Sequence, residues 1–459
     1  MFGSKQPKQD RKSPLRSAPL LVALPALLFP LLALAQDSDE MQRQYTWAQD
    51  VAPVFQEKCQ DCHRPNSIAP MPLLTYEQVK PFAPLIRYRV ANRVMPPWHI
   101  NPDVGIQSYS NDRGLSEEQR NMIIAWADQG APEGDESLAP APRMFNDALV
   151  WRLEDQMGSA PDLVVDSKTY DLPAVSQDKW FRPLTPTGLT EPHWVKAIEI
   201  RPKNPESRKV VHHSLAFLLQ DEKGATGLPE GVEQQAGPSL FMEWAVGKAG
   251  QVFKPDSGKL MLPDSQILWE MHMHANGERV PNVQVEIGVW FYDEAPEHRT
   301  LLTMLDARGE HSLDIPPNEI AVTQGTFVLP APARLENFQP HMHMRGKAMT
   351  MEAIYPNGHR EVLAFVDNFQ WNWQINYIFD EDVAPLVPKG TMIVTRAWHD
   401  NTKNNPYNPD PEQWVGWGDR TVDEMSHNWV DITYLGQEEY ERMVADRNAK
   451  QLALQNGSD

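Results

Sequence analysis

Short apolar runs separated by turns fill the chain from about residue 160 onward, and they constrain its fold more than any other feature. Clusters of Gly, Pro and Asn interrupt these runs, and 41 of the 459 residues are proline, about 9%, against the usual ~5%. Such spacing and turn density are typical of antiparallel strands layered as β-sandwiches or jelly rolls. The runs expected to form strands are VVDSKTYDLP, WVKAIEIRP, VVHHSLAFLL, QILWEMHMH, VQVEIGVWFY, TMIVTRAW and NWVDITYL.

Length and charge set the broad class of the protein. At the usual ~150 residues per domain, 459 residues predict about three domains. A hydrophobic content of 41% excludes disorder for most of the chain. The formal net charge of -20 repels phosphate backbones, so nucleic acid is not an expected partner. We expect a small helical domain over residues 41–135, a Pro/Ala-rich linker over 136–159, β domains up to about residue 435 and a helical tail over 436–459.

The first 35 residues have the features of an export signal. Five cationic side chains precede the apolar stretch LLVALPALLFPLLALA, which ends in the cleavage pattern Ala33-Leu34-Ala35. An uncleaved membrane anchor is the alternative, but Pro25 and Pro30 within the stretch favour cleavage near Ala35. No other stretch reaches the ~18 apolar residues of a membrane span. We therefore expect an exported, periplasmic protein without a membrane span after cleavage.

The chain contains two cysteines, and they lie three residues apart in the sequence Cys59-x-x-Cys62-His63. A disulfide framework is therefore ruled out. The pattern C-x-x-C-H is that of covalent c-type haem attachment. Thiols about one helical turn apart bond the two haem vinyl groups, and the adjacent histidine is the proximal iron ligand. A redox-active dithiol is the alternative, and the export signal favours one covalent haem c.

The segments around this motif fit a small haem domain. YTWAQDVAPVFQEKC predicts an amphipathic helix leading into the motif, and SEEQRNMIIAWADQG predicts a second helix with Ser116 as its N-cap and Gly130 at its end. Met95, which precedes two prolines, is the expected sixth iron ligand, and Met71 and His99 are the alternatives. In this order, residues 41–135 resemble a small class I cytochrome c.

Three clusters of histidine fall on predicted strands. Histidines at positions i and i+2 leave the same face of a strand and can chelate one ion, whereas adjacent histidines need a local twist or a strand end. Imidazole together with thioether suits copper that cycles between two oxidation states. A lone histidine on a strand is more often structural, but three clusters predict a metal site. The clusters are His212-His213, His272-Met273-His274 and His341-Met342-His343.

The histidine-bearing segments follow the order of a known family. VHHSL resembles its His-His doublet, PDSQILWEMHMHANG its next ligand strand, QPHMHMRGK its His-x-His motif, and GWGDRTVDEM the segment that ends in a methionine ligand. YPNG, PKGT and HDNTKNNPYNPDP also occur in the order seen in bacterial relatives. Over about residues 160–435 the chain resembles the copper type II, ascorbate-dependent monooxygenases, which include peptidylglycine α-hydroxylating and dopamine β-monooxygenase. It resembles a bacterial form that carries an N-terminal cytochrome c domain.

The resemblance implies which residues hold copper. His212, His213 and His272 would bind an electron-transfer copper, while His341, His343 and Met425 would bind the catalytic copper. His274 shares a strand face with His272 and stays an alternative, although the family pattern matches His272 better. The remaining histidines lack such a context and are expected to be surface or core residues; among them His427, two residues after Met425, has the best claim to a role. They are His193, His298, His311, His359, His399 and His427.

The resemblance also implies a fold and an activity. The fold is a pair of jelly-roll-like β-sandwich domains over residues 160–308 and 309–435, with a boundary near 305–312 and one copper on each. The activity is insertion of one atom of O₂ into a C–H bond of a small-molecule substrate. The reductant is ascorbate or another electron source, and we expect a haem c that relays electrons from a periplasmic donor to the two coppers. The alternative is a non-catalytic copper- and haem-binding electron carrier or sensor.

One departure from the family bears on the substrate. The peptide-hydroxylating enzyme carries an arginine two residues before its His-x-His motif, where it anchors the substrate carboxylate, and this chain has Gln339 there. The departure argues against a peptide-acid substrate.

Overall fold

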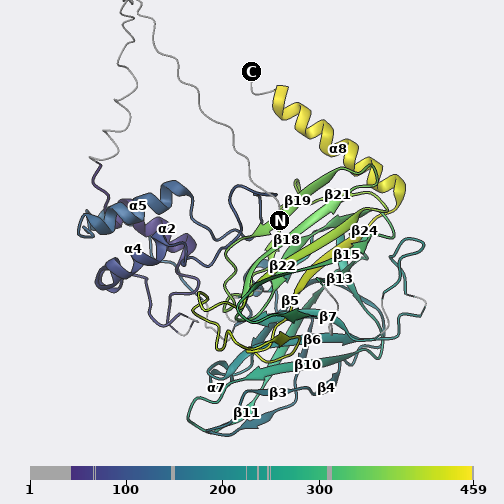
Figure 1. Cartoon of the computed structure of the whole chain (residues 1–459), viewed down its shortest axis with the longest axis horizontal. Coiled ribbons are helices and arrows are strands. Elements are labelled where there is room, and N and C mark those ends of the chain that lie inside the picture. The colour runs from purple at the N-terminus through teal and green to yellow at the C-terminus, as the bar shows by residue number, and fades with distance from the viewer. Residues whose placement is uncertain are drawn as a thin grey trace, which may run out of the picture. The chain divides into compact units, whose positions relative to one another are not determined.

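The computed structural model describes residues 43–65, 67, 69–145, 150–223, 225–234, 237–245, 248, 250–307 and 313–456. The predicted leader, His311 and most of the predicted boundary between the β domains lie outside these residues. The described chain is mostly β-sheet, with short helices before residue 160 and one long helix at its end (Figure 1). The β class expected after residue 160 is confirmed, and each of the seven predicted runs contains a strand.

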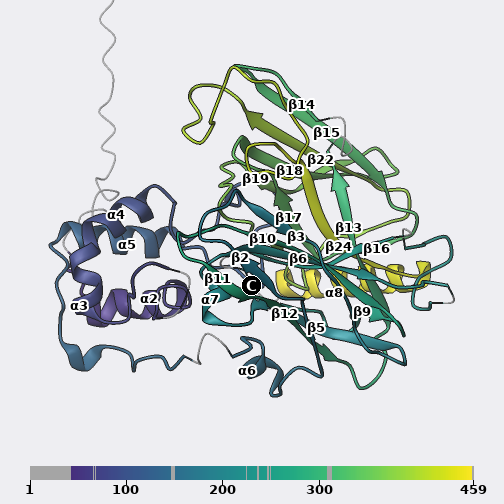
Figure 2. The ribbon, with the colours of Figure 1, turned by 90° about the horizontal axis from the view of Figure 1, so that it is seen from below.

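Residues 45–138 form a group of short helices that cluster together (Figure 2). The Ser116 hydroxyl accepts a hydrogen bond from the backbone N–H of Gln119, whose side chain accepts one from Ser116. The predicted N-cap and both predicted helices are thus confirmed, and Trp47 and Trp126 lie in the apolar core between them. The helices are η1 (Trp47–Val51), α2 (Ala52–Lys58), α3 (Tyr76–Val79), η2 (Lys80–Phe82), α4 (Ala83–Ala91), α5 (Glu117–Asp128) and η3 (Glu136–Leu138).

Two sheets share one apolar core between residues 160 and 292. One sheet has the strand order β3-β10-β6-β7, and the other contains β1-β12-β5-β9. Trp269 of β10 and Ile287 of β12 are fully buried in the core between them. The strands are β1 (Leu163–Asp166), β2 (Tyr170–Leu172), β3 (Lys179–Phe181), β4 (Leu184–Pro186), β5 (His193–Pro202), β6 (Val211–Leu219), β7 (Ser239–Ala245), β8 (Gln251–Val252), β9 (Ser257–Met261), β10 (Gln266–Met273), β11 (Val280–Val283) and β12 (Val285–Phe291), and the short helices α6 (Glu154–Met157) and α7 (Pro205–Arg208) accompany them.

A second pair of sheets follows in the sequence. The sheet β15-β22-β18-β19 packs on strands β13, β24, β16 and β17 through a core that includes Phe338 and Met351. The helix predicted after residue 436 is confirmed as α8 (Gln437–Asn456). The strands are β13 (His298–Asp306), β14 (Asp314–Ile315), β15 (Ile320–Val328), β16 (Ala333–Leu335), β17 (Asn337–His341), β18 (Gly346–Ile354), β19 (Arg360–Val366), β20 (Tyr377–Ile378), β21 (Leu386–Val387), β22 (Met392–Asp400), β23 (Val415–Gly416) and β24 (His427–Tyr434).

The two pairs of sheets are joined by hydrogen bonds as well as by chain connection. The start of β13 pairs in parallel with β9, where His298 lies opposite Ser257 and Arg299 opposite Gly258. Through this pairing one sheet runs from β1 to β21 and contains strands of both halves. The pairing of β9 with β13 therefore restrains the half that carries His341 relative to the half that carries His213.

Among the described residues, no helix is both long enough and apolar enough to cross a membrane.

Gly325 of β15 marks a close approach between two backbones. A Cβ atom at this position would lie 1.8 Å from the carbonyl oxygen of Asp306, at the end of β13. We expect Gly325→Ala to lower the free energy of unfolding by about 3 kcal/mol, since backbone atoms cannot move aside as side chains do. Urea unfolding followed by tryptophan fluorescence measures the change. Gly436→Ala, where a Cβ would meet no atom within 4 Å, is the control and should change stability by less than about 0.5 kcal/mol.

Candidate metal centres

A cluster of three histidines is built on the neighbouring strands β6 and β10. His213 and His272 lie directly opposite each other in the ladder. Nδ1 of His213 lies 3.1 Å from Nδ1 of His212 and 3.4 Å from Nδ1 of His272. All three side chains offer a ligand atom within 4.8 Å of the others. The sequence prediction that these three residues come together is therefore supported by the geometry.

A β-bulge explains how two adjacent histidines reach one site. His272 pairs with His213, but the next residue, Met273, pairs with Val211. His212 is therefore the extra residue of a bulge, which re-aims its side chain. This is the local irregularity that the adjacent pair required.

Burial keeps this cluster neutral. It lowers the pKa of His213 well below its ordinary value, that of His272 to about 4, and that of His212 as well. Neutral imidazole is the form that donates a lone pair to a metal ion. The cluster is thus in its metal-binding protonation state at neutral pH.

His274 lies beside this cluster but has a different partner. Its Nδ1 lies 2.5 Å from Oδ1 of Asp178, which directly precedes β3. Oδ2 of the same carboxylate lies 3.3 Å from Nε2 of His272. Asp178, His272 and His274 therefore form a second group of potential ligands that overlaps the first.

His341 and His343 form a second centre at the end of β17. Their ring centroids are 5.3 Å apart. His341 lies opposite His427 in the ladder between β17 and β24, and this ladder ends at that pair. Beyond it the segment before Met425 contacts His343, because Glu424 accepts a hydrogen bond from the backbone of His343 and Asp423 accepts one from its ring.

The ring of His343 is oriented by backbone. Its Nδ1 donates to the carbonyl oxygen of Asp423 at 3.1 Å. The proton on Nδ1 leaves Nε2 as the lone-pair donor. Burial, the largest effect, lowers the pKa of His343 to about 3 and that of His341 below its ordinary value.

Glu424 is a structural residue of this centre that the sequence reasoning missed. Its fully buried carboxylate accepts hydrogen bonds from the backbone N–H groups of His343 at 2.9 Å and Arg345 at 2.6 Å. Burial raises its pKa to about 8. His399, expected to be an ordinary surface or core residue, is buried and donates from Nε2 to the carbonyl oxygen of Met425 at 3.1 Å. The sequence signal for Glu424 was its position directly before Met425, because an acidic residue next to a predicted metal ligand can hold that ligand in place without binding the metal.

His427 also belongs to this neighbourhood. Its ring stacks on that of His341 with centroids 6.0 Å apart, and its Nε2 makes no hydrogen bond within the described chain. Burial lowers its pKa to about 3.

The cysteine motif forms a helical turn after α2. The backbone N–H groups of Cys62 and His63 donate to the carbonyl oxygen of Cys59. Nδ1 of His63 donates to the carbonyl oxygen of Met71 at 3.1 Å, which leaves Nε2 free to bind iron. Burial raises the pKa of the Cys59 thiol to about 12.

The three candidates for the sixth iron ligand lie in different surroundings. Met95 lines a pocket of about 380 Å³ that is bounded by Lys58, Trp98 and Leu115. The carbonyl of Met71 is engaged with the proximal His63. His99 is buried, and its backbone N–H donates to the Tyr377 hydroxyl at 3.2 Å.

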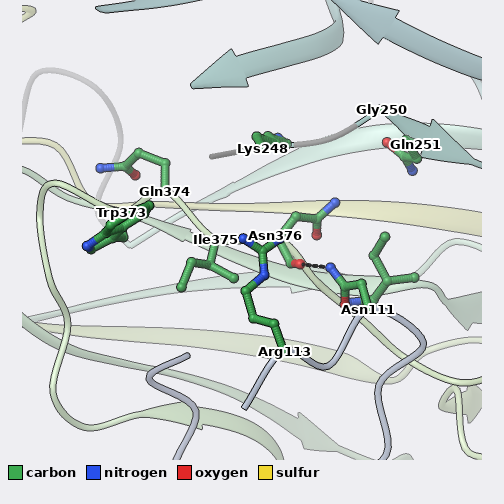
Figure 3. A pocket seen from close by; sticks show the side chains of 10 residues that line it. Asn111, Arg113, Lys248, Gly250, Gln251, Trp373, Gln374, Ile375 and Asn376 are labelled. Carbon is green, nitrogen blue, oxygen red and sulfur yellow. Dashed lines mark hydrogen bonds between the residues drawn. The ribbon is translucent and has the colours of Figure 1, made fainter. Parts of the chain in front are cut away.

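A pocket of about 80 Å³ is lined by Gln374, whose side chain donates to the carbonyl oxygen of Met342, the residue after His341. Figure 3 shows Asn111 and Arg113 on one side of it, Lys248 and Gln251 on the other, and the segment from Trp373 to Asn376 between them. The Asn111 side chain donates to the carbonyl oxygen of Asn376 at 2.7 Å. The pocket thus combines residues from the N-terminal helical region with residues of both β halves.

Two polar side chains of this pocket contact β17 and the residue after it. Gln374 donates from Nε2 to the carbonyl oxygens of Met342 at 3.4 Å and Trp371 at 2.8 Å. Lys248 donates to Oε1 of Gln339 at 2.9 Å and pairs with Glu243 at 3.3 Å. The Gln339 side chain also donates to Glu243. Gln339 is therefore held in a buried network with Lys248 and Glu243.

Comparisons with known proteins add little. No family model and no curated protein matches the chain. Among solved structures, the empty particle of cowpea mosaic virus is similar at 10% identity over 63% of this chain and 95% of that one, with a TM-score of 0.25. The VP2 subviral particle of infectious bursal disease virus matches at 10% identity over 62% and 75%, with a TM-score of 0.18. A putative secreted protein from Parabacteroides distasonis matches at 9% identity over 62% and 96%, with a TM-score of 0.16. At such TM-scores the likenesses carry no conclusion about this chain.

Proposed function

We propose that the chain is an exported copper- and haem-dependent monooxygenase, a bacterial member of the copper type II ascorbate-dependent family, that hydroxylates a C–H bond of a small molecule. The observation that carries the proposal is the meeting of His341, His343 and the segment ending in Met425 on one sandwich, in a chain whose other sandwich holds the three-histidine cluster. Three imidazoles suit copper in both oxidation states, whereas a thioether favours reduced copper. Copper bound by His341, His343 and Met425 would supply the activation of O₂.

The protein's own contribution at this centre is to hold the ligands. Asp423 orients the ring of His343, and Glu424 binds the backbone of His343 and Arg345 to the loop that precedes Met425. Such outer contacts fix the tautomer and the direction of a metal ligand. Ligands from β17 and from the loop before β24 are thus kept together before metal binds.

Residues 41–135 are proposed to be the cytochrome c domain. Cys59 and Cys62 would bond the haem, His63 would bind iron through Nε2, and Met95 would be the sixth ligand. Met95 is favoured because it lines the pocket beside Trp98, whereas Met71 and His99 do not line it. Two thiols, an imidazole and a thioether are the donor types that a covalent haem requires.

The proposed electron relay is supported by contacts of the segment that follows Met95. The backbone N–H of Asn101 donates to Phe365 O at 2.7 Å, and the Trp98 ring packs against Tyr377 with centroids 4.7 Å apart. Tyr377 in turn stacks near Phe338, three residues before His341. The haem-bearing region is thus packed against the sandwich that carries the catalytic ligands, as electron delivery from a periplasmic donor requires.

The pocket lined by Gln374 and Lys248 is the proposed substrate site. Its rim carries the cations Arg113 and Lys248, amide groups and the ring of Trp373. Such a lining suits a small planar or acidic molecule more than a peptide, because Gln339 is held by Glu243 and Lys248 and does not offer the family's arginine.

Trp373→Ala is expected to raise KM about tenfold with a smaller change in kcat, because the ring supplies apolar contact with the substrate but no ligand to the metal. Steady-state kinetics on the first active substrate of a panel measures the change. Trp414, 63% exposed and not part of the pocket lining, provides the control Trp414→Ala. Equal KM values for the two variants would place the substrate elsewhere.

The function is tested by metal and haem quantification followed by turnover. The purified periplasmic form should hold two coppers and one haem, and the reduced protein should consume O₂ and transfer labelled oxygen from ¹⁸O₂ to a panel substrate. Zinc in place of copper, or fully loaded protein that transfers no oxygen to any substrate, would instead support the non-catalytic carrier or sensor.

A further inference from the structure

Asp178 faces two histidines of β10 with its two oxygens. Oδ2 lies 3.3 Å from Nε2 of His272, and Oδ1 lies 2.5 Å from Nδ1 of His274. Asp178 directly precedes β3, in which Trp180 pairs with His272. The ladder between β3 and β10 therefore brings the carboxylate to the edge of the three-histidine cluster.

The ring of His272 is enclosed on several sides. Its side chain is 1% exposed, and the Trp180 ring stacks on it at 4.2 Å between centroids with 11° between planes. Nδ1 faces His213 Nδ1 at 3.4 Å, while Nε2 makes no hydrogen bond of regular geometry within the described chain. The two ring nitrogens thus face different groups: one faces the cluster and the other faces Asp178.

We propose that Asp178 is a positioning residue for the copper that His212, His213 and His272 would hold. An ionised carboxylate only accepts hydrogen bonds, so a ring nitrogen that faces it carries the proton and the other nitrogen keeps its lone pair. Asp178 therefore directs Nδ1 of His272 toward the cluster. The proposal rests on the proposed function, since that function supplies the metal.

The same carboxylate separates the two candidate histidines. His272 lies in β10 and His274 follows the end of that strand. The Asp178 contact occupies Nδ1 of His274, whose side chain is 44% exposed, and His274 is not in the group of ligand atoms that His212, His213 and His272 form. Asp178 thus selects His272 as the third ligand.

Asp178 also supplies charge. Three neutral imidazoles carry none, so a bound cupric ion keeps its full positive charge unless a neighbouring anion compensates it. A carboxylate in contact with His272 and within electrostatic range of His212 stabilises the cupric form more than the cuprous form. Asp178→Asn should therefore weaken Cu(II) binding more than Cu(I) binding and raise the reduction potential of this copper.

The alternative is that the overlapping group of Asp178, His272 and His274 binds the ion itself. The two arrangements differ in whether His274 is a ligand. Asp178→Asn, His274→Gln and His272→Gln in the full-length, haem-loaded protein therefore form the test set. Each is titrated with Cu(II) and with Cu(I) against a competing chelator, and Cu(II) EPR reports the donor set.

If Asp178 positions His272, Asp178→Asn weakens one Cu(II) equivalent 10- to 100-fold, the range for outer contacts of metal ligands, and leaves the other equivalent unchanged. His274→Gln then keeps both equivalents and the wild-type EPR spectrum, while His272→Gln loses one. Asp178→Glu, which retains the charge, should recover part of the affinity. Haem absorbance and thermal unfolding of each variant confirm that it is folded.

Two results would overturn the proposal. Loss of the same copper in His274→Gln would make His274 a ligand, and wild-type copper binding in Asp178→Asn would make the carboxylate irrelevant. Either result leaves two coppers in the wild-type protein and so leaves the proposed function standing. A wild-type protein that binds no copper would instead contradict the proposed function itself.

Discussion

Met425→Ala should abolish oxygen transfer to substrate while leaving the haem and the three-histidine cluster loaded. The thioether is the one soft donor proposed for the catalytic copper, and it follows directly on Asp423 and Glu424, which both contact His343. Loss of the outer contacts of a metal ligand typically lowers metal affinity or activity about 10- to 100-fold. Removal of the ligand itself should therefore reduce kcat/KM by more than about 100-fold. Product formation from ¹⁸O₂ measures this directly.

Met443→Ala is the matched control for this change. Met443 is a half-buried methionine like Met425, but it lies on α8 and is not a proposed ligand. It should retain wild-type turnover. In Met425→Ala, copper analysis should find that one of the two coppers binds more weakly. Oxygen transfer at the wild-type rate in Met425→Ala would rule out the monooxygenase assignment of this centre.

The double variant Cys59→Ala, Cys62→Ala should contain no covalent haem. Each thiol supplies one of the two thioether bonds, and the chain has no other cysteine that could replace them. Haem staining after denaturing electrophoresis should fall from a strong band to background. Oxygen transfer driven by a periplasmic donor should stop as well, whereas transfer driven by a small chemical reductant that reaches copper directly should persist.

Variants of the three candidate sixth ligands refine this result. Met95→Ala should keep covalent haem but change the ferric haem spectrum, because Met95 lines the pocket next to Trp98. Met71→Ala and His99→Ala should leave the spectrum unchanged, since neither residue lines that pocket. A changed spectrum in His99→Ala with an unchanged one in Met95→Ala would reverse the assignment. Covalent haem retained by the double cysteine variant would refute the attachment motif.

Local sequence was sufficient to predict features that form within a single helix or strand. The capping box at Ser116 acts within four residues, and the strands of the seven apolar runs follow from side chains that alternate over short distances. These features depend on neighbours in the chain, so they can be read before folding is known.

Other features required contacts between distant strands. The bulge that turns His212 toward His213 arises from the register of β6 on β10, and the parallel pairing of β9 with β13 joins the two halves. Glu424 could not be recognised in advance, because its role comes from backbone groups that lie 79 and 81 residues away in sequence.

The sequence by itself determined the haem attachment motif, the mainly β class and the donor residues that could bind metal. Only the tertiary structure distinguishes the surroundings of His272 and His274, because His272 is grouped with His212 and His213 and the carboxylate of Asp178 contacts the two histidines differently. Periodicity tells which way a side chain points from its own strand. Which ring nitrogen of a histidine is contacted, and by which group, depends on the strand that packs beside that histidine.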